Sequence, residues 1–286
     1  MGVNGLRWTV RVSGFGPAFL LLHGFTGSGR TWDGEFADAA RNAGFTTIAP
    51  DLPGHGGTAW RAGDPAAWRA GDPAGPADSS RATIERSADD LPGLLRALGH
   101  DGAHVVGYSM GARVALRLAI AHPACVARLV LEAPSAGIAD AAGRATRRAA
   151  DDALARILER DGIGPFIDTW ERTPVLAGEG RLGARARAAL REIRVAHDPA
   201  GLACSLRAAG QGAMEPLHGR LREIASPTLV IVGADDPVRD RAAAVAAGIP
   251  GARLTVIDGA GHAPHLEAPA AFRRLVLAFV SEDHAA

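Results

Sequence analysis

Short apolar segments alternate with helix-forming segments along most of this chain, and this alternation most constrains the fold. The apolar segments each end in small or polar residues: AFLLLHG, TTIAPDL, AHVVGYS, RLVLEAP, TLVIVGADD and RLTVIDGAGH. Helix-compatible segments such as GARVALRLAIAH and APAAFRRLVLAFV follow them. Continuous apolar runs are typical of parallel strands that are buried on both faces and connected by helices. The pattern therefore predicts an α/β fold with a mainly parallel central sheet flanked by helices.

Two regions interrupt the alternation. Residues 135–216, between the RLVLEAP and TLVIVGADD strands, are helical in propensity and rich in alanine and arginine. A helical insertion at this point would lie over the strand ends, so we expect a cap that encloses a substrate, with a core formed by residues 1–134 and 217–286. Residues 59–78 contain the octapeptide AWRAGDPA twice in succession, and their Gly, Pro and Asp content predicts an exposed loop.

The composition excludes several classes of function. The chain has 31 basic and 31 acidic residues, and this balance indicates neither a nucleic-acid-binding nor a membrane-binding protein. The sequence contains no lysine, which excludes chemistry that needs a lysine Schiff base. Cys125 and Cys204 lie far apart, so we expect neither a disulfide nor a cysteine metal site. Because no apolar run is long enough to span a membrane, we expect a cytoplasmic protein, a monomer or weak homo-oligomer, without metal or organic cofactor.

A candidate nucleophile follows the third apolar segment. Ser109 lies in Gly107-Tyr-Ser-Met-Gly111, after a predicted strand and before a predicted helix. This is the pattern of a nucleophile elbow, in which the two glycines allow a tight turn and the serine hydroxyl is held at the start of the helix. We therefore expect Ser109 to be the reactive alcohol.

The last apolar segment supplies a candidate base for this serine. In GAGHAPHLEAP, His262 directly follows the predicted strand and can reach back toward Ser109, whereas His265, one helical turn later, is expected to pack locally. A histidine that acts as a base needs a carboxylate to orient it. The loop VGADDPV offers two neighbouring acids, of which Asp236 has the expected spacing and Asp235 remains the alternative.

Two backbone amides are candidates for an oxyanion hole. In LLLHGFTGSGRTW, the N–H of Phe25 follows a His-Gly pair at the end of a predicted strand. Together with the N–H of Met110, it can point at a developing negative oxygen. His55, in DLPGHGGT, also follows a strand, but we expect a structural role for it.

Taken together, these motifs resemble the α/β-hydrolase superfamily over nearly the whole chain. The resemblance implies an α/β-hydrolase fold for this chain, with a mainly parallel central sheet flanked by helices and a helical cap inserted after the sixth strand. A narrower resemblance joins LHGFTGSGRTW, DLPGHGGT and GYSMGAR with the cap segments RATRRAADD, FIDTWERTPVL and LREIR. These segments are similar to the family of 2-succinyl-6-hydroxy-2,4-cyclohexadiene-1-carboxylate synthases of menaquinone biosynthesis. The resemblance implies a lyase that eliminates pyruvate from 2-succinyl-5-enolpyruvyl-6-hydroxy-3-cyclohexene-1-carboxylate, with the serine of the triad as base.

The same resemblance implies a set of substrate-binding residues. The substrate is a small polycarboxylate, and guanidinium groups bind carboxylates through two parallel hydrogen bonds. Arg113, one turn into the helix that follows Ser109, is the first candidate. The remaining candidates are Arg144 or Arg147 and Arg194 in the cap, with Trp170 as an apolar wall and Tyr108 beside the serine. The alternatives are that Arg144, Arg147 and Arg148 form the solvated face of a helix and that Trp170 belongs to the core of the cap.

A second function remains open from the sequence. The same Ser, His and Asp residues would serve a carboxylesterase or a hydrolase of carbon–carbon bonds. A substrate of the second kind also carries free carboxylates, so Arg113 argues against simple esterases more than against this subclass. A non-enzymatic descendant of the fold has less support, because every position of the triad is occupied.

Overall fold

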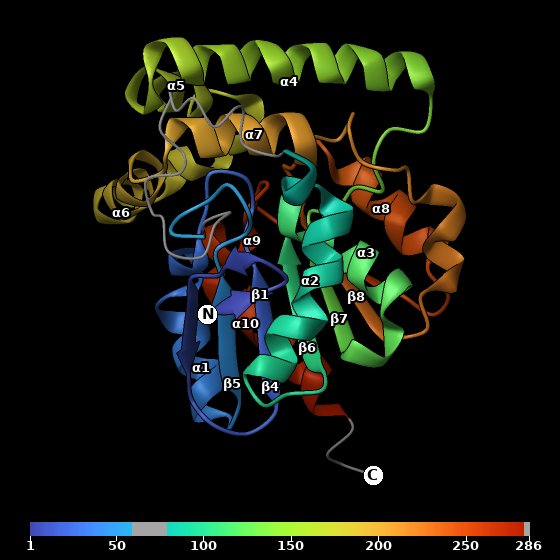
Figure 1. The fold of residues 1–286 in the computed structure, drawn as a ribbon. Helices are drawn as coiled ribbons and strands as arrows, with labels where there is room; N and C mark the ends of the chain where they lie inside the picture. Colours follow the sequence, from blue (N-terminus) through green and yellow to red (C-terminus); the bar gives the residue numbers. More distant parts are fainter. Residues whose placement is uncertain (59–78, 283–286) are drawn as a thin grey trace.

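A seven-stranded sheet forms the centre of the computed structural model, which describes residues 1–58 and 79–282 (Figure 1). Across the sheet the strand order is β3-β5-β4-β6-β7-β8-β9, and β3 runs antiparallel to β5 while the other pairs are parallel. The strands are β3 (Val10–Ser13), β4 (Ala18–Leu22), β5 (Thr46–Pro50), β6 (Ala103–Tyr108), β7 (Val126–Glu132), β8 (Thr228–Gly233) and β9 (Arg253–Ile257). A separate two-stranded sheet pairs β1 (Gly2–Val3) with β2 (Leu6–Arg7). The predicted loop at residues 59–78 lies outside the described residues.

The strands of this sheet are apolar at successive positions because helices cover both of its faces. On β4, Leu20 and Leu22 belong to one buried cluster, and Phe19 and Leu21 belong to another. Successive side chains of a strand point to opposite faces, so an uninterrupted apolar run contributes side chains to the cores on both faces of the sheet. The structure thereby has the mainly parallel, helix-flanked sheet that the alternation predicts.

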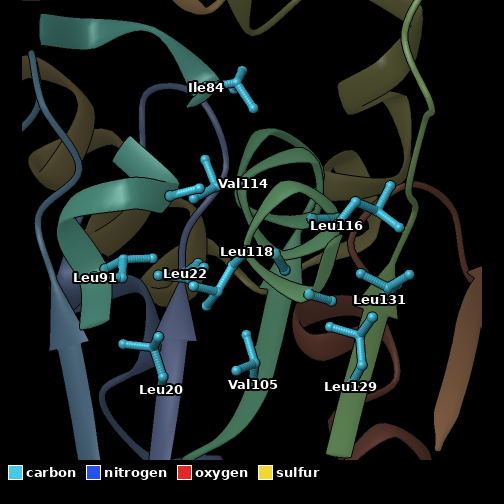
Figure 2. Close-up of a cluster of buried hydrophobic side chains, with 14 of the residues drawn as sticks. Leu20, Leu22, Ile84, Leu91, Val105, Val114, Leu116, Leu118, Leu129 and Leu131 are labelled. Atoms are coloured by element: carbon cyan, nitrogen blue, oxygen red, sulfur yellow. The ribbon is translucent and has the colours of Figure 1, made fainter. Parts of the chain in front are cut away.

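Each face of the sheet has its own set of helices. The helices α2 (Ile84–Ala97), α3 (Met110–Ala121) and α8 (Arg239–Gly248) share the cluster of Leu20 and Leu22. Figure 2 shows Leu91 of α2 and Leu118 of α3 in this cluster, together with side chains of β4, β6 and β7. The helices α1 (Glu35–Asn42) and α10 (Pro269–Val280) contribute Phe36, Phe272 and Val276 to the cluster on the opposite face.

Four helices between β7 and β8 form the insertion. They are α4 (Ala141–Asp161), α5 (Ile163–Trp170), α6 (Ala184–Val195) and α7 (Pro199–Ala209), and they lie together above the sheet (Figure 1). In the described chain, β7 is the fifth strand of the sheet in sequence order, where the expectation counted six. The aspartates at residues 140 and 198 start α4 and α7, because each side chain accepts the backbone N–H three residues later.

The inserted helices have a small apolar core of their own. It contains Leu158 of α4, Phe166 and Ile167 of α5, and Leu202 and Leu206 of α7. These helices fall within residues 135–216, and the strands of the large sheet fall outside them. Among the helices that the structure describes, none combines the length and the apolar character needed to cross a membrane.

Candidate active site

Ser109 lies at the turn between β6 and α3, in a strained backbone conformation. Its φ angle is 52°, a left-handed value that is uncommon for a residue with a side chain. The flanking glycines explain how the turn is accommodated. A Cβ atom at Gly111 would lie 2.2 Å from the carbonyl oxygen of Leu22, and one at Gly107 would lie 2.5 Å from that of Gly111. The Gly-x-Ser-x-Gly pattern is therefore a packing requirement that places the serine hydroxyl at the N-terminus of α3.

His262 and Asp236 lie in line with this hydroxyl. The distance from Ser109 Oγ to His262 Nε2 is 2.9 Å, and the distance from His262 Nδ1 to Asp236 Oδ2 is also 2.9 Å. An ionised carboxylate only accepts hydrogen bonds, so Nδ1 carries a proton and Nε2 is free to accept the serine proton. The other oxygen of Asp236 accepts the backbone N–H of Val238 at 2.9 Å, which fixes the carboxylate. The arrangement can activate Ser109 as a base or as a nucleophile.

The neighbouring acid and histidine are placed differently. Asp235 is exposed and lies 3.6 Å from Arg181, so Asp236 is the acid at the histidine. His265, in the short helix α9 (Pro264–Glu267), is buried against Glu132. Its Nδ1 lies 2.9 Å from Glu132 Oε1, which also accepts the backbone N–H of His265 at 2.7 Å. His265 therefore packs locally, at a distance of 4.7 Å between its ring and that of Tyr108.

The loop that carries Phe25 is held by buried histidines. His23 Nε2 accepts the backbone N–H of Leu52 at 2.9 Å, and burial lowers the pKa of His23 from 6.5 to about 4, so the ring is neutral at pH 7. His55 packs against the rings of His23 and Phe25, as expected of a structural residue. His197, between α6 and α7, accepts the backbone N–H of Gly56 at 2.9 Å. The second nitrogen of His197 lies 2.9 Å from the carbonyl oxygen of residue 26.

A cavity of about 250 Å³ lies over Ser109, between the core and the inserted helices. Phe25 and Met110, whose amides are the candidate oxyanion hole, both line it. A Cβ atom at Gly24 would lie 2.6 Å from the ring of Tyr108, so only glycine lets this loop approach the elbow so closely. The sequence-predicted residues that line this cavity are Phe25, Tyr108, Ser109, Met110, Arg113, Arg147, Trp170 and His262.

Arg113 brings a buried positive charge to the wall of this cavity. The residue is 7% exposed, and its Nη1 donates a hydrogen bond to the carbonyl oxygen of Ala209, at the end of α7. Burial, followed by the nearby charge of Arg147, lowers the pKa of Arg113 to about 10, so the group stays charged at pH 7. Among the residues that the structure describes, no carboxylate lies within ion-pair distance of this guanidinium. The cavity therefore offers an anion a buried cation that has no direct ion pair and on which Asp151 and Glu85 act only at longer range.

Arg147 reaches the same cavity from α4. Its Nε donates a hydrogen bond to Asp151 Oδ1 at 2.8 Å, one helical turn away. Asp151 is 2% exposed, and burial raises its pKa while Arg147 opposes the rise. The structure therefore places Arg113 and Arg147 beside one cavity, with Asp151 as the carboxylate closest to them.

Arg144 and Arg194 are not among the residues that line this cavity. Arg144 Nη1 donates to the carbonyl oxygens of residues 138 and 139, at 3.2 and 2.6 Å, where the chain enters α4. Arg194 is 7% exposed and donates to Glu179 at 2.6 Å and to Glu171 at 3.2 Å. It lines a separate cavity of about 30 Å³, to which Tyr108 and Phe25 also contribute. Two carboxylates thus already balance the charge of Arg194.

Aromatic side chains form the apolar part of the wall. Trp170 contacts Phe25 edge to face, with ring centroids 5.2 Å apart, and stacks on Phe166 at 6.1 Å. It is therefore both a wall of the cavity and part of the apolar contacts of the cap. Burial raises the pKa of Tyr108 well above its usual value, so its phenol is neutral beside Ser109.

Sequence reasoning missed four polar residues at this cavity, of which Ser135 and Ser205 are small and Arg241 and Gln211 are long. Arg241, on α8 of the core, and Gln211, which follows α7, both line it. No motif marks either residue, because their neighbours in the cavity come from distant parts of the sequence. Within the described residues, no group of three or more His, Cys, Asp or Glu side chains is arranged to hold a metal ion.

Comparison with known proteins places this geometry in a family. The model of the alpha/beta hydrolase family matches residues 19–275. A 2-succinyl-6-hydroxy-2,4-cyclohexadiene-1-carboxylate synthase of Serratia proteamaculans (strain 568) is 31% identical over 266 residues, which cover 90% of each chain. The structure of MenH from S. aureus has a TM-score of 0.84 and 29% identity, covering 96% of this chain and 98% of that one. A malate-bound thermophilic esterase from Thermogutta terrifontis has a TM-score of 0.81 and 25% identity, covering 98% and 95%. The chain therefore belongs to the α/β-hydrolase family and, within it, to the sequence family of the 2-succinyl-6-hydroxy-2,4-cyclohexadiene-1-carboxylate synthases.

Proposed function

We propose that this enzyme eliminates pyruvate from 2-succinyl-5-enolpyruvyl-6-hydroxy-3-cyclohexene-1-carboxylate to give 2-succinyl-6-hydroxy-2,4-cyclohexadiene-1-carboxylate. The observation that carries the proposal is the buried guanidinium of Arg113, which lines the cavity over Ser109 without a carboxylate partner in the described structure. A buried, uncompensated charge is costly, so its position beside a reactive alcohol favours an anionic substrate. The names of the relatives support the same reaction.

In the proposed mechanism, the triad removes a proton from the ring. Ser109 passes its proton to His262 Nε2 and takes the proton from ring carbon 2, which is acidic because it lies next to the succinyl carbonyl. The electron pair forms a double bond between carbons 2 and 3, the double bond between carbons 3 and 4 moves to carbons 4 and 5, and the bond from carbon 5 to the enolpyruvyl oxygen breaks. The imidazolium of His262 returns its proton to the leaving group, which becomes pyruvate. No acyl-enzyme forms.

The cavity residues would stabilise charge during this step. Negative charge grows on the succinyl oxygen, and the amides of Phe25 and Met110 are proposed to donate to it. Removing one such donor typically costs about 10²–10³-fold in rate. Arg113 and Arg147 would hold carboxylates that do not change during the reaction, so they contribute mainly to affinity and orientation. We propose lesser roles for Arg144 and Arg194, because backbone carbonyls and glutamates already occupy their donors.

Hydrolysis by the same triad is the second candidate function. The likeness to the Thermogutta terrifontis esterase, at a TM-score of 0.81, favours it, and the same 2.9 Å contacts would activate Ser109 as a nucleophile. In that case an acyl-enzyme forms on Ser109 and water releases it.

One experiment separates the two functions. The purified enzyme is mixed with the enolpyruvyl substrate, and pyruvate is followed through lactate dehydrogenase and NADH. In parallel, p-nitrophenyl acetate is used to look for a burst of one p-nitrophenolate for each active site. We expect rapid pyruvate release and no burst, and we expect Ser109→Ala to lose the pyruvate signal. A burst with p-nitrophenyl acetate, without pyruvate release from the first substrate, would establish the hydrolase instead.

A further inference from the structure

Arg241 stands at the place where the active-site cavity meets a second cavity. The second cavity has a volume of about 370 Å³ and runs along the segment that follows β7 and along α8. Arg241 and Ser135 line both cavities. Arg241 is itself exposed, unlike Arg113. It therefore lies at the solvent-exposed edge of the inner cavity.

Arg241 makes no direct ion pair, although the preceding residue, Asp240, lines the second cavity with it. Its Nη1 donates a hydrogen bond to the amide oxygen of Gln211 at 3.2 Å, across the boundary between core and cap. In the part of the chain that the structure describes, no carboxylate lies within ion-pair distance of it. Arg147, by contrast, is already paired with Asp151. Arg113 and Arg241 are thus the cavity-lining arginines without an ion pair among the described residues, whereas Arg147 would share its charge between Asp151 and a ligand.

We infer that Arg241 is a specificity-determining residue that binds a carboxylate of the substrate at the entrance of the cavity. The inference rests on the proposed function for the number of carboxylates, because the substrate carries three of them and the inner wall offers Arg113 and Arg147. A third carboxylate would then face Arg241, which exchanges its neutral partner Gln211 for an anion. Such a contact selects polycarboxylates over uncharged esters of similar size.

Because Arg241 is exposed, we expect its replacement to have a moderate effect on substrate affinity that depends on salt. A contact at the surface is weakened by water and salt, so it contributes less than the buried contact of Arg113. The carboxylate that it binds does not change in the reaction, so ground state and transition state are held alike and the loss falls on KM. We expect Arg241→Gln to raise KM about two- to fivefold with little change in kcat.

The control is Arg239, two residues earlier at the start of α8. Its Nη1 lies 3.4 Å from the carbonyl oxygen of Ala234, and it is not among the residues that line either cavity. Arg239→Gln removes the same charge from the same helix, so it reports the general effect of net charge. Arg241→Lys keeps the charge and should recover most of the affinity.

The test measures turnover and binding separately. Pyruvate release gives KM and kcat for the wild type, Arg241→Gln, Arg241→Lys and Arg239→Gln, at 50 and 500 mM NaCl. Calorimetry with citrate, an unreactive tricarboxylate, gives a dissociation constant that needs no turnover. Among these variants, only Arg241→Gln is expected to raise both KM and the dissociation constant for citrate. We expect its difference from the wild type to be smaller at 500 mM NaCl than at 50 mM NaCl.

Either of two results with the variants overturns the inference. The first is an unchanged KM and citrate affinity in Arg241→Gln, and the second is an equal change of KM and citrate affinity in Arg239→Gln. A wild type that binds no citrate at millimolar concentration overturns it as well. If the wild type binds citrate through Arg241 but releases no pyruvate, the proposed reaction fails and the anion contact stands.

Discussion

Replacing Arg113 by methionine should make the protein more stable and less active at the same time. Burial lowers the pKa of Arg113 from its ordinary value to about 10. Since about 1.4 kcal/mol corresponds to each pH unit, the folded chain without an anion holds this charge at a cost of roughly 3 kcal/mol. Folded and unfolded chains are both protonated below pH 10, so the full cost applies at pH 7.

The expected gain is smaller than this cost. Methionine has a similar length without the charge, but it loses the charged hydrogen bond to the carbonyl oxygen of Ala209, which contributes about 1.5–3 kcal/mol. The free energy of unfolding should therefore rise by at most about 1.5 kcal/mol, and Tm by roughly 2–4 °C for each kcal/mol. Two charged hydrogen bonds to a carboxylate contribute about 3–6 kcal/mol together, so kcat/KM should fall by about 10²–10⁴.

Scanning calorimetry without ligand and the pyruvate assay measure the two effects. Arg117→Met, one turn later on α3 and not among the residues that line the cavity, is the matched control and should leave kcat/KM unchanged. Arg113→Lys keeps a charge and should not gain stability. An Arg113→Met protein that melts below the wild type, or that keeps its full kcat/KM, would refute the argument that an unbalanced charge waits for an anion.

Three further predictions concern the triad, the turn and the buried histidines. Asp236→Asn should lower kcat by about 10⁴ in the pyruvate assay, because the amide favours the wrong tautomer of His262; a loss under tenfold would contradict this role. Gly111→Ala should lower Tm sharply, because its Cβ would meet the Leu22 carbonyl at 2.2 Å, and an unchanged melting curve would count against it. The neutral folded form of His23 contributes stability that is fully present above pH 6.5 and is lost as pH falls toward 4. Urea titrations between these pH values should show a fall of roughly 3 kcal/mol, which His23→Gln should reduce.

The local sequence was sufficient to predict the residues whose placement depends on backbone geometry. The turn at Ser109 needs glycine on both sides, and His262 and Asp236 follow strands that end at the same edge of the sheet. Their positions could therefore be predicted from neighbouring residues. The family comparison likewise confirms the resemblance carried by these motifs.

The arginines could not be sorted in this way. Arg144 and Arg147 lie on one helix three residues apart, yet only Arg147 lines the cavity, because Arg144 turns to the carbonyls that precede α4. The glutamates that hold Arg194 lie 15 and 23 residues away along the chain. The sequence did not indicate Arg241, because residues of both the core and the cap form the cavity that it lines. The charge of an arginine alone therefore does not predict its role, which depends on the groups that its guanidinium contacts in the folded chain.

His197 connects the cap to two loops of the core through hydrogen bonds. Its ring is bonded on one side to the turn at Gly56 and on the other to the backbone of residue 26, next to Phe25. If the cap moved away at this point, it would pull on the loop whose Phe25 amide we propose as part of the oxyanion hole. The position of the cap and that of the Phe25 loop are therefore linked through His197. Substrate entry would disturb the Phe25 loop least at the solvent-exposed contact between Arg241 and Gln211. One hydrogen bond of 3.2 Å joins these two side chains.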